Sequence, residues 1–175
     1  METFREALIT EPGKIILHEV EKKTPGSGEV MIKVVSSAIC GSDMHLYSGR
    51  HPYAKLPTTV GHELAGVIEE IGADVTKFKV GDRVCVEPLI ACGHCYYCQR
   101  GRYDYCETLR LKYRSGSSGY ADYYYAEERW VHLLPDGISF DEGALMEPLA
   151  CTVHAAMKAR IQLCDSVCVI GDGPI

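Results

Sequence analysis

The sequence has no hydrophobic run long enough to cross a membrane, and its first 20 residues contain no apolar core typical of a signal peptide. It also has no excess of positive charge, because 18 Lys and Arg stand against 24 Asp and Glu, giving a formal net charge of −6. This balance argues against a surface for nucleic acid or for an anionic membrane. The nine cysteines are clustered and odd in number, which fits a reducing compartment better than a disulfide framework. We therefore expect a cytoplasmic protein without a nucleic-acid or membrane partner.

Four of these cysteines share one short segment with the spacing C-x2-C-x2-C-x7-C: Cys92, Cys95, Cys98 and Cys106. Two tight turns and a short loop can bring four thiolates to the corners of one tetrahedron, which is the closed geometry of a structural zinc. The intervening residues are mostly polar, so packing of four small core residues is a poor explanation. An iron–sulfur cluster is the main alternative, but the common bacterial run ends in a three-residue gap followed by proline. The pattern here favours zinc.

Short β-rich stretches alternate with turns rich in Gly and Pro from residue 1 to about residue 135. The predicted strands cover residues 30–35, 64–71, 79–86, 120–126 and 130–134. Such spacing is typical of a barrel or a sandwich, so we expect a mostly β fold with few helices.

The pattern changes after residue 138. Ser139 and Glu142 form a capping box that predicts a helix start, and Pro148 should kink or break the helix before a second segment at 149–160. Residues 167–170 then read as an apolar strand running into Gly-x-Gly, which resembles the opening of a dinucleotide-binding βαβ unit. The candidate cofactor-binding residues are Gly171, Gly173, Pro174 and Ile175.

A second group of possible metal ligands lies outside the four-cysteine segment. Cys40 follows one predicted strand, and His62 with Glu63 precedes the next, so loops could bring a thiolate, an imidazole and a carboxylate together. A mixed set with fewer than four protein ligands is typical of a catalytic zinc, because an open position can accept water or substrate. Taken singly, Cys40 as a buried loop cysteine and His62 as a core histidine are simpler explanations. The combination favours a metal.

These motifs together carry a family resemblance. The segments are Cys40-Gly41-Ser42-Asp43-x-His45, Gly61-His62-Glu63-x-x-Gly66, Gly81-Asp82-Arg83-Val84, the four-cysteine lobe and Glu147-Pro148. They resemble the zinc-dependent medium-chain alcohol dehydrogenases, most closely the branch of sorbitol (polyol) dehydrogenase, with threonine dehydrogenase nearby. The resemblance extends over nearly all of residues 5–175. It implies a GroES-like, barrel-containing catalytic domain at 1–150, then a connecting helix and the first strand of a truncated Rossmann domain at 151–175.

The resemblance also implies roles for individual residues at a catalytic zinc. Cys40 and His62 match the ligands, and Glu63 matches an acid that lies beside the metal and can ligate it. Glu147 matches a third ligand or the carboxylate that holds the zinc-bound water; classical liver-type enzymes have cysteine there, so glutamate points to the polyol branch. Asp43 matches the carboxylate that orients the ligand histidine.

Further roles follow from the same resemblance. Ser42 and His45 match the relay that carries the alcohol proton to solvent. Cys92, Cys95, Cys98 and Cys106 match the structural zinc lobe, whose full cysteine set animal sorbitol dehydrogenases usually lack; this favours a bacterial-type polyol dehydrogenase. We thus expect two zinc ions per chain and NAD or NADP as cofactor.

The expected activity is oxidation of a secondary alcohol, such as a polyol or sugar alcohol, by hydride transfer to NAD(P). We expect a homo-oligomer, dimer or tetramer, for the full-length protein, and an inactive piece if these 175 residues stand alone. The alternatives are a threonine or other secondary-alcohol dehydrogenase, a ketone reductase working in the opposite direction, and a zinc-stabilised binding module without catalysis.

Overall fold

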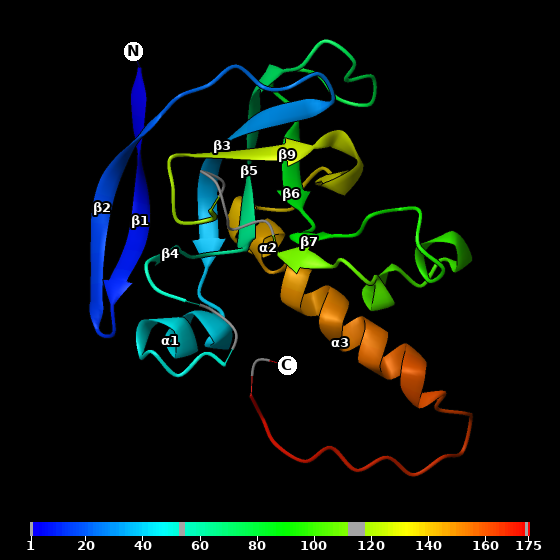
Figure 1. Ribbon diagram of the computed structural model, residues 1–175. Helices are drawn as coiled ribbons and strands as arrows, with labels where there is room; N and C mark the ends of the chain where they lie inside the picture. The colour runs from blue at the N-terminus through cyan, green and yellow to red at the C-terminus, as the bar shows by residue number, and fades with distance from the viewer. Residues whose placement is uncertain (1, 53–54, 112–117, 174) are drawn as a thin grey trace.

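The computed structural model describes residues 2–52, 55–111, 118–173 and 175, and antiparallel β-sheet dominates it (Figure 1). The larger sheet has five strands in the order β10–β6–β5–β3–β9. Their bounds are Glu29–Ala38 (β3), Glu63–Ile71 (β5), Arg83–Val86 (β6), Tyr123–Glu127 (β9) and Val131–Leu133 (β10). Each of the five predicted stretches therefore overlaps a strand, and the mostly β fold class is confirmed.

A smaller sheet closes one side of the molecule. It has the order β2–β1–β4, and a separate pair joins β7 to β8. The bounds are Thr3–Glu11 (β1), Lys14–Glu21 (β2), Thr58–Thr59 (β4), Leu89–Ile90 (β7) and Arg110–Leu111 (β8). The Ala7 N–H donates to the Tyr120 carbonyl (2.8 Å) and the Asp122 N–H to the Arg5 carbonyl (2.9 Å), so β1 is tied to the segment that leads into β9. These hydrogen bonds connect the two sheets into a curved, partly closed barrel, as expected.

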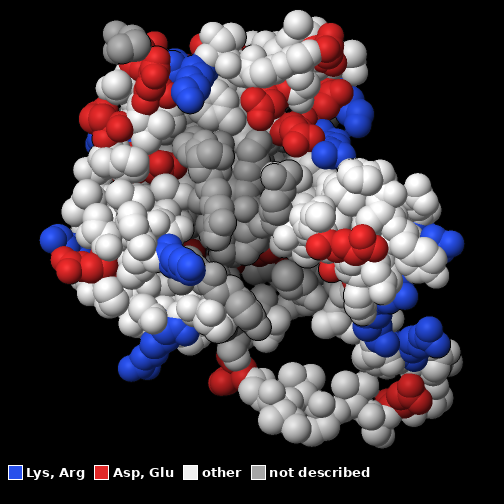
Figure 2. All heavy atoms as spheres, viewed as in Figure 1, with Lys and Arg blue, Asp and Glu red and all other residues white. Residues whose placement is uncertain are grey.

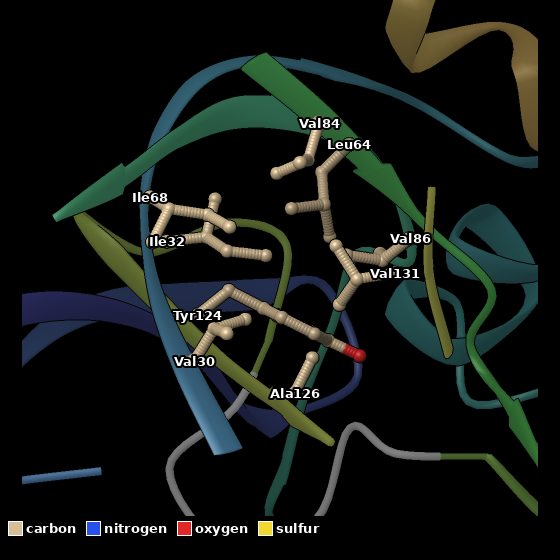
Figure 3. Close-up of a cluster of buried hydrophobic side chains, with 9 residues drawn as sticks. All are labelled: Val30, Ile32, Leu64, Ile68, Val84, Val86, Tyr124, Ala126 and Val131. Carbon is tan, nitrogen blue, oxygen red and sulfur yellow. The ribbon is translucent and has the colours of Figure 1, made fainter. Parts of the chain in front are cut away.

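The core lies among the strands of the larger sheet, where the labelled side chains of Figure 3 meet. They are Val30, Ile32, Leu64, Ile68, Val84, Val86, Tyr124, Ala126 and Val131. Strands β3 and β5 approach so closely that a Cβ at Gly66 would lie 2.1 Å from the Lys33 carbonyl oxygen. Only glycine fits there, because any side chain would collide with the partner strand's backbone. The register of β3 against β5 also shifts between Val34 and Ser36.

A short helix, α1 (Gly41–Tyr47), occupies a segment where the sequence predicts a loop. Cys40 is the N-cap residue, and the carboxylate of Asp43, three residues on, accepts a hydrogen bond from the Cys40 N–H at 3.1 Å. An acid at the third helical position satisfies a backbone donor that the helix leaves free and favours the positive end of its dipole. The helix therefore begins at the residue after the proposed ligand Cys40.

The two helices after residue 139 are α2 (Phe140–Ala144) and α3 (Met146–Ala159). The capping box is confirmed, since the Ser139 Oγ accepts from the Glu142 N–H at 3.2 Å and the Glu142 carboxylate accepts from the Ser139 N–H at 2.7 Å. The sequence predicts a break at Pro148, but the break lies at Leu145. Pro148 is instead accommodated in the first turn of α3, where a proline removes only an N–H that has no helical partner anyway.

The strand predicted at residues 167–170 is absent. Residues 161–173 and residue 175 form neither helix nor strand and are exposed, and Figure 1 shows this segment in red as an open loop beyond α3. A strand needs a neighbour with which to exchange backbone hydrogen bonds, and the part of the chain that the structure describes provides none for this segment.

The outer surface carries mixed charges. On the face shown in Figure 2, Lys and Arg are scattered among Asp and Glu. Among the described residues, no helix has the length and apolar character needed to span a bilayer.

Candidate metal centres and active site

The four-cysteine segment folds into a lobe between β7 and β8, with two short 3₁₀ helices, Cys98–Arg100 and Tyr103–Tyr105. The four sulfur atoms of Cys92, Cys95, Cys98 and Cys106 all lie within 4.8 Å of one another. The Sγ atoms of Cys92 and Cys98 are 3.9 Å apart, and zinc–sulfur bonds of about 2.3 Å in a tetrahedron require about 3.8 Å. All four are free thiols rather than disulfides. The lobe therefore has the donors and spacing for one tetrahedral ion.

Backbone amides point at the sulfurs of this lobe. The Cys95 N–H donates to the Cys92 Sγ and the Cys92 N–H to the Cys106 Sγ, each at 3.3 Å. Amide donors favour the thiolate and lower the pKa of Cys106 to about 6, whereas desolvation and the neighbouring thiols raise the pKa of Cys98 to about 12. Four negative charges this close repel one another, so a divalent cation is needed before all four can be thiolates.

The second group of ligands comes from two places in the fold. Cys40 caps α1, and His62 with Glu63 stands at the start of β5. One ligand atom from each of the three lies within 4.8 Å of the others, with His62 and Glu63 buried and Cys40 half-buried. Sulfur, nitrogen and oxygen donors in a three-residue set leave a fourth position open, which fits a catalytic zinc. The structure thus brings together three of the four predicted ligands.

Glu147, the fourth predicted ligand, stands beside this cluster without being one of its close members. It lies in the first turn of α3 and is half-buried. Burial raises the pKa of Glu147, while the nearby His62 lowers it and Glu63 raises it further. Its carboxylate is therefore within electrostatic range of His62 and Glu63.

Asp43 is buried behind His62, as its predicted orienting role requires. Its Oδ1 lies 3.8 Å from the His62 Nδ1, and a carboxylate on that side of an imidazole favours metal binding through the other ring nitrogen, Nε2. Three donors hold the carboxylate: the Cys40 N–H at 3.1 Å, the Gly61 N–H at 3.4 Å and the Tyr120 hydroxyl at 2.7 Å.

Tyr120 is the residue of this site that the sequence pattern does not single out. Burial, and then its hydrogen bond to Asp43, raises the pKa of Tyr120, so the hydroxyl keeps its proton at neutral pH. Its contact partner lies 77 residues away in the chain. The only local signal is the Gly119-Tyr120 pair ahead of a β-rich stretch, and this pair carries no indication of a metal site.

Gly61 allows the chain just before His62 to approach Tyr120 closely. Its φ of +90° is a conformation that residues with a side chain rarely adopt, and a Cβ there would lie 2.6 Å from the Tyr120 ring and 2.8 Å from its backbone nitrogen. The Gly119 N–H also donates to the Gly61 carbonyl at 2.7 Å. This close backbone contact places Tyr120 beside the residue that precedes His62, the proposed ligand.

The proposed relay residues both lie on α1. Ser42 is half-buried and His45 is exposed, and a separation of three residues places them on the same side of a helix. The backbone carbonyl of His45 accepts hydrogen bonds from the Arg50 N–H (2.9 Å) and the His51 N–H (3.1 Å), which anchors the end of the helix. A half-buried Ser42 followed by an exposed His45 suits a path that carries a proton from the open cluster to solvent.

The candidate cofactor residues are not gathered at a site. Gly171, Gly173 and Ile175 are exposed in the segment without regular structure, and Pro174 lies outside the described residues. Gly171 has a φ of +104°, which is compatible with a glycine turn but does not by itself form a phosphate cradle.

Comparison with known proteins gives the family. The sequence-family model of the alcohol dehydrogenase GroES-like domain matches residues 26–136. Sorbitol dehydrogenase of Halalkalibacterium halodurans is 42% identical over 164 residues, covering 93% of this chain and 48% of that protein. D-arabitol-phosphate dehydrogenase of Enterococcus avium is 41% identical over 149 residues, covering 84% and 42%.

A solved structure agrees with these relatives. A protein of Sinorhizobium meliloti, described as a zinc-binding dehydrogenase and bound to NADP, has a TM-score of 0.82 at 32% identity, covering 90% of this chain and 46% of that one. The chain spans about half the length of the curated relatives it matches. With its curled β-sheets and two thiolate-containing clusters, the chain belongs to the alcohol dehydrogenase family with a GroES-like domain.

Proposed function

We propose that this chain is the catalytic-domain part of a zinc-dependent dehydrogenase that oxidises a secondary alcohol, a polyol or sugar alcohol, with NAD(P)⁺. The observation that carries the proposal is the pair of unlike clusters: a closed set of four thiols, and an open set of Cys40, His62 and Glu63. A binding module stabilised by zinc needs only the closed set. The names of the relatives, sorbitol dehydrogenase and D-arabitol-phosphate dehydrogenase, support the substrate class.

The residues of the open site would have separate roles. When bound, zinc supplies a Lewis acid that lowers the pKa of an alcohol hydroxyl. Cys40, His62 and Glu63 would hold it, with Glu147 at its side and Asp43 fixing the imidazole. Ser42 accepts the alcohol proton and passes its own to His45, which is exposed to solvent and belongs to the side-chain type that best exchanges protons near neutral pH. When bound, NAD(P)⁺ would supply the acceptor for the hydride that the alcohol carbon loses.

The remaining assignments belong to the same proposal. Residues 1–150 would form the catalytic domain, and residues 151–175 would lead into a Rossmann domain in which Gly171, Gly173, Pro174 and Ile175 approach the cofactor. Support comes from the relative bound to NADP. We propose one zinc in each cluster, a cytoplasmic location and a homo-oligomeric assembly, dimer or tetramer, for the whole protein.

The test is an assay of the whole protein with NAD⁺ or NADP⁺ on polyols, simple secondary alcohols and threonine, together with a zinc count. Two zinc ions per chain, one readily removed by a chelator, and reduction of the cofactor with polyols are expected. A single tightly held zinc would support the non-catalytic module. Threonine as the preferred substrate would move the chain to the neighbouring branch.

The relay is tested by replacing Ser42 with alanine. We expect turnover to fall by about 10²- to 10⁴-fold with the zinc content unchanged, because Ser42 contributes no ligand. Ser27→Ala, at an exposed serine in the turn before β3, serves as a control and should leave turnover nearly unaltered. Loss of zinc in Ser42→Ala would contradict the relay assignment.

A further inference from the structure

Tyr120 is joined to the proposed catalytic metal site by a short chain of contacts. Its hydroxyl lies 2.7 Å from the Asp43 Oδ2, and the other oxygen of Asp43 faces the His62 Nδ1 at 3.8 Å. The Asp43 side chain is only 5% exposed. Tyr120 donates to this carboxylate from its side chain, whereas Cys40 and Gly61 donate from their backbone N–H groups.

The hydroxyl has two possible acceptors but only one proton to donate. The Ala38 carbonyl lies 3.1 Å away and the Asp43 carboxylate 2.7 Å. Hydrogen bonds to a charged oxygen are shorter and about twice as strong as neutral ones, so the proton is directed to Asp43. The carboxylate is thereby held in one orientation, with its other oxygen turned toward His62.

Tyr120 is itself held firmly by neighbouring backbone. Its N–H donates to the Val60 carbonyl at 3.3 Å, and its carbonyl accepts from the Ala7 N–H of β1 at 2.8 Å. Its ring lies against Gly61, the residue that precedes the ligand histidine. A side chain anchored to β1 and to the start of β5 can fix a buried carboxylate with little freedom of its own.

We propose that Tyr120 is a positioning residue of the catalytic zinc site, which acts through the Asp43 carboxylate to fix the His62 ring and so sets the affinity and geometry of the bound metal. The proposal rests on the proposed function insofar as the open cluster must bind zinc. It adds a third member, from a distant segment, to the arrangement of ligand and carboxylate.

The experiment compares Tyr120→Phe with Tyr124→Phe in the whole protein. Tyr124 is equally aromatic and buried in the core, so its variant controls for loss of a hydroxyl elsewhere in the sheet. Metal affinity is measured by competition with chelators, and the open site is also loaded with Co²⁺, whose visible spectrum reports ligand geometry. Loss of a partner that orients a ligand typically weakens binding by about 10- to 100-fold.

Tyr120→Phe should weaken zinc at the open site by about 10- to 100-fold and shift the Co²⁺ spectrum, while the four-cysteine lobe keeps its ion and Tyr124→Phe behaves as wild type. Adding Tyr120→Phe to Asp43→Asn should have little further effect, because both act through one carboxylate. Unchanged affinity and spectrum in Tyr120→Phe, or fully additive losses in the double variant, would overturn the proposal. A wild-type protein that binds metal only in the lobe would instead refute the proposed function.

Discussion

Replacing Gly61 with alanine should damage the protein more than its backbone conformation alone explains. Gly61 has φ +90°, and Gly81 has nearly the same value, +92°. A Cβ at Gly81 meets nothing within 4 Å, whereas a Cβ at Gly61 lies 2.6 Å from the Tyr120 ring and 2.8 Å from its backbone nitrogen. The two glycines form a matched pair that separates backbone strain from steric collision.

The magnitudes follow from this difference. A side chain at positive φ costs roughly 1–2 kcal/mol, which is the whole expected loss for Gly81→Ala. Overpacking against the ring and backbone of Tyr120 adds about 1–3 kcal/mol, so Gly61→Ala should lose about 2–5 kcal/mol in total. Because relief of the collision pushes Tyr120 away from Asp43, Gly61→Ala should also weaken metal binding at the open site, and Gly81→Ala should not.

The assay is urea unfolding of both variants beside wild type, with zinc affinity measured on the folded proteins. Equal losses of stability in the two variants would refute the steric reasoning. Normal zinc binding in a destabilised Gly61→Ala variant would show that displacing Tyr120 does not affect how His62 binds the metal.

Two further predictions address the lobe and the sheet junction. Cys98→Ser should reduce the zinc content by one ion per chain and leave the open site loaded, as elemental analysis with and without mild chelation can show; loss of both ions would contradict the independence of the clusters. The Arg5 guanidinium, hydrogen-bonded to Asp122 at 2.8 Å, holds the pKa of that carboxyl below its ordinary value. A lowered carboxyl pKa contributes stability that is present above the ordinary value and is lost as pH falls through the folded-state value. Since the pair is partly exposed, Asp122→Asn should lower the free energy of unfolding by about 0.2–1 kcal/mol at pH 7, and by nothing once wild-type Asp122 is protonated. Urea titrations should therefore be run at pH 7 and at a pH at which Asp122 is protonated. An equal loss of unfolding free energy at the two would rule out the ion pair as the cause.

Features that depend on residues close together in the chain can be predicted from the sequence alone. The C-x2-C-x2-C-x7-C spacing brings Cys92, Cys95, Cys98 and Cys106 within 4.8 Å, because short turns leave few other arrangements. The capping box at Ser139 follows from local hydrogen bonding, and the strands of the larger sheet follow from β-rich runs between turns of Gly and Pro. The helix α1 has a local signal too, the acid three residues after Cys40, but a seven-residue helix shows too little periodicity to stand out.

Features that join distant segments are decided only by the fold. The strand predicted at 167–170 depends on partner strands, and apolar residues alone cannot form one. The contact between Asp43 and Tyr120 spans 77 residues and exists because β1 hydrogen-bonds the segment that leads into β9, while glycines at 61 and 119 let two backbones touch. The ligand types are present in the sequence as Cys40, His62 and Glu63. Only tertiary packing brings Tyr120 to the Asp43 carboxylate that faces His62.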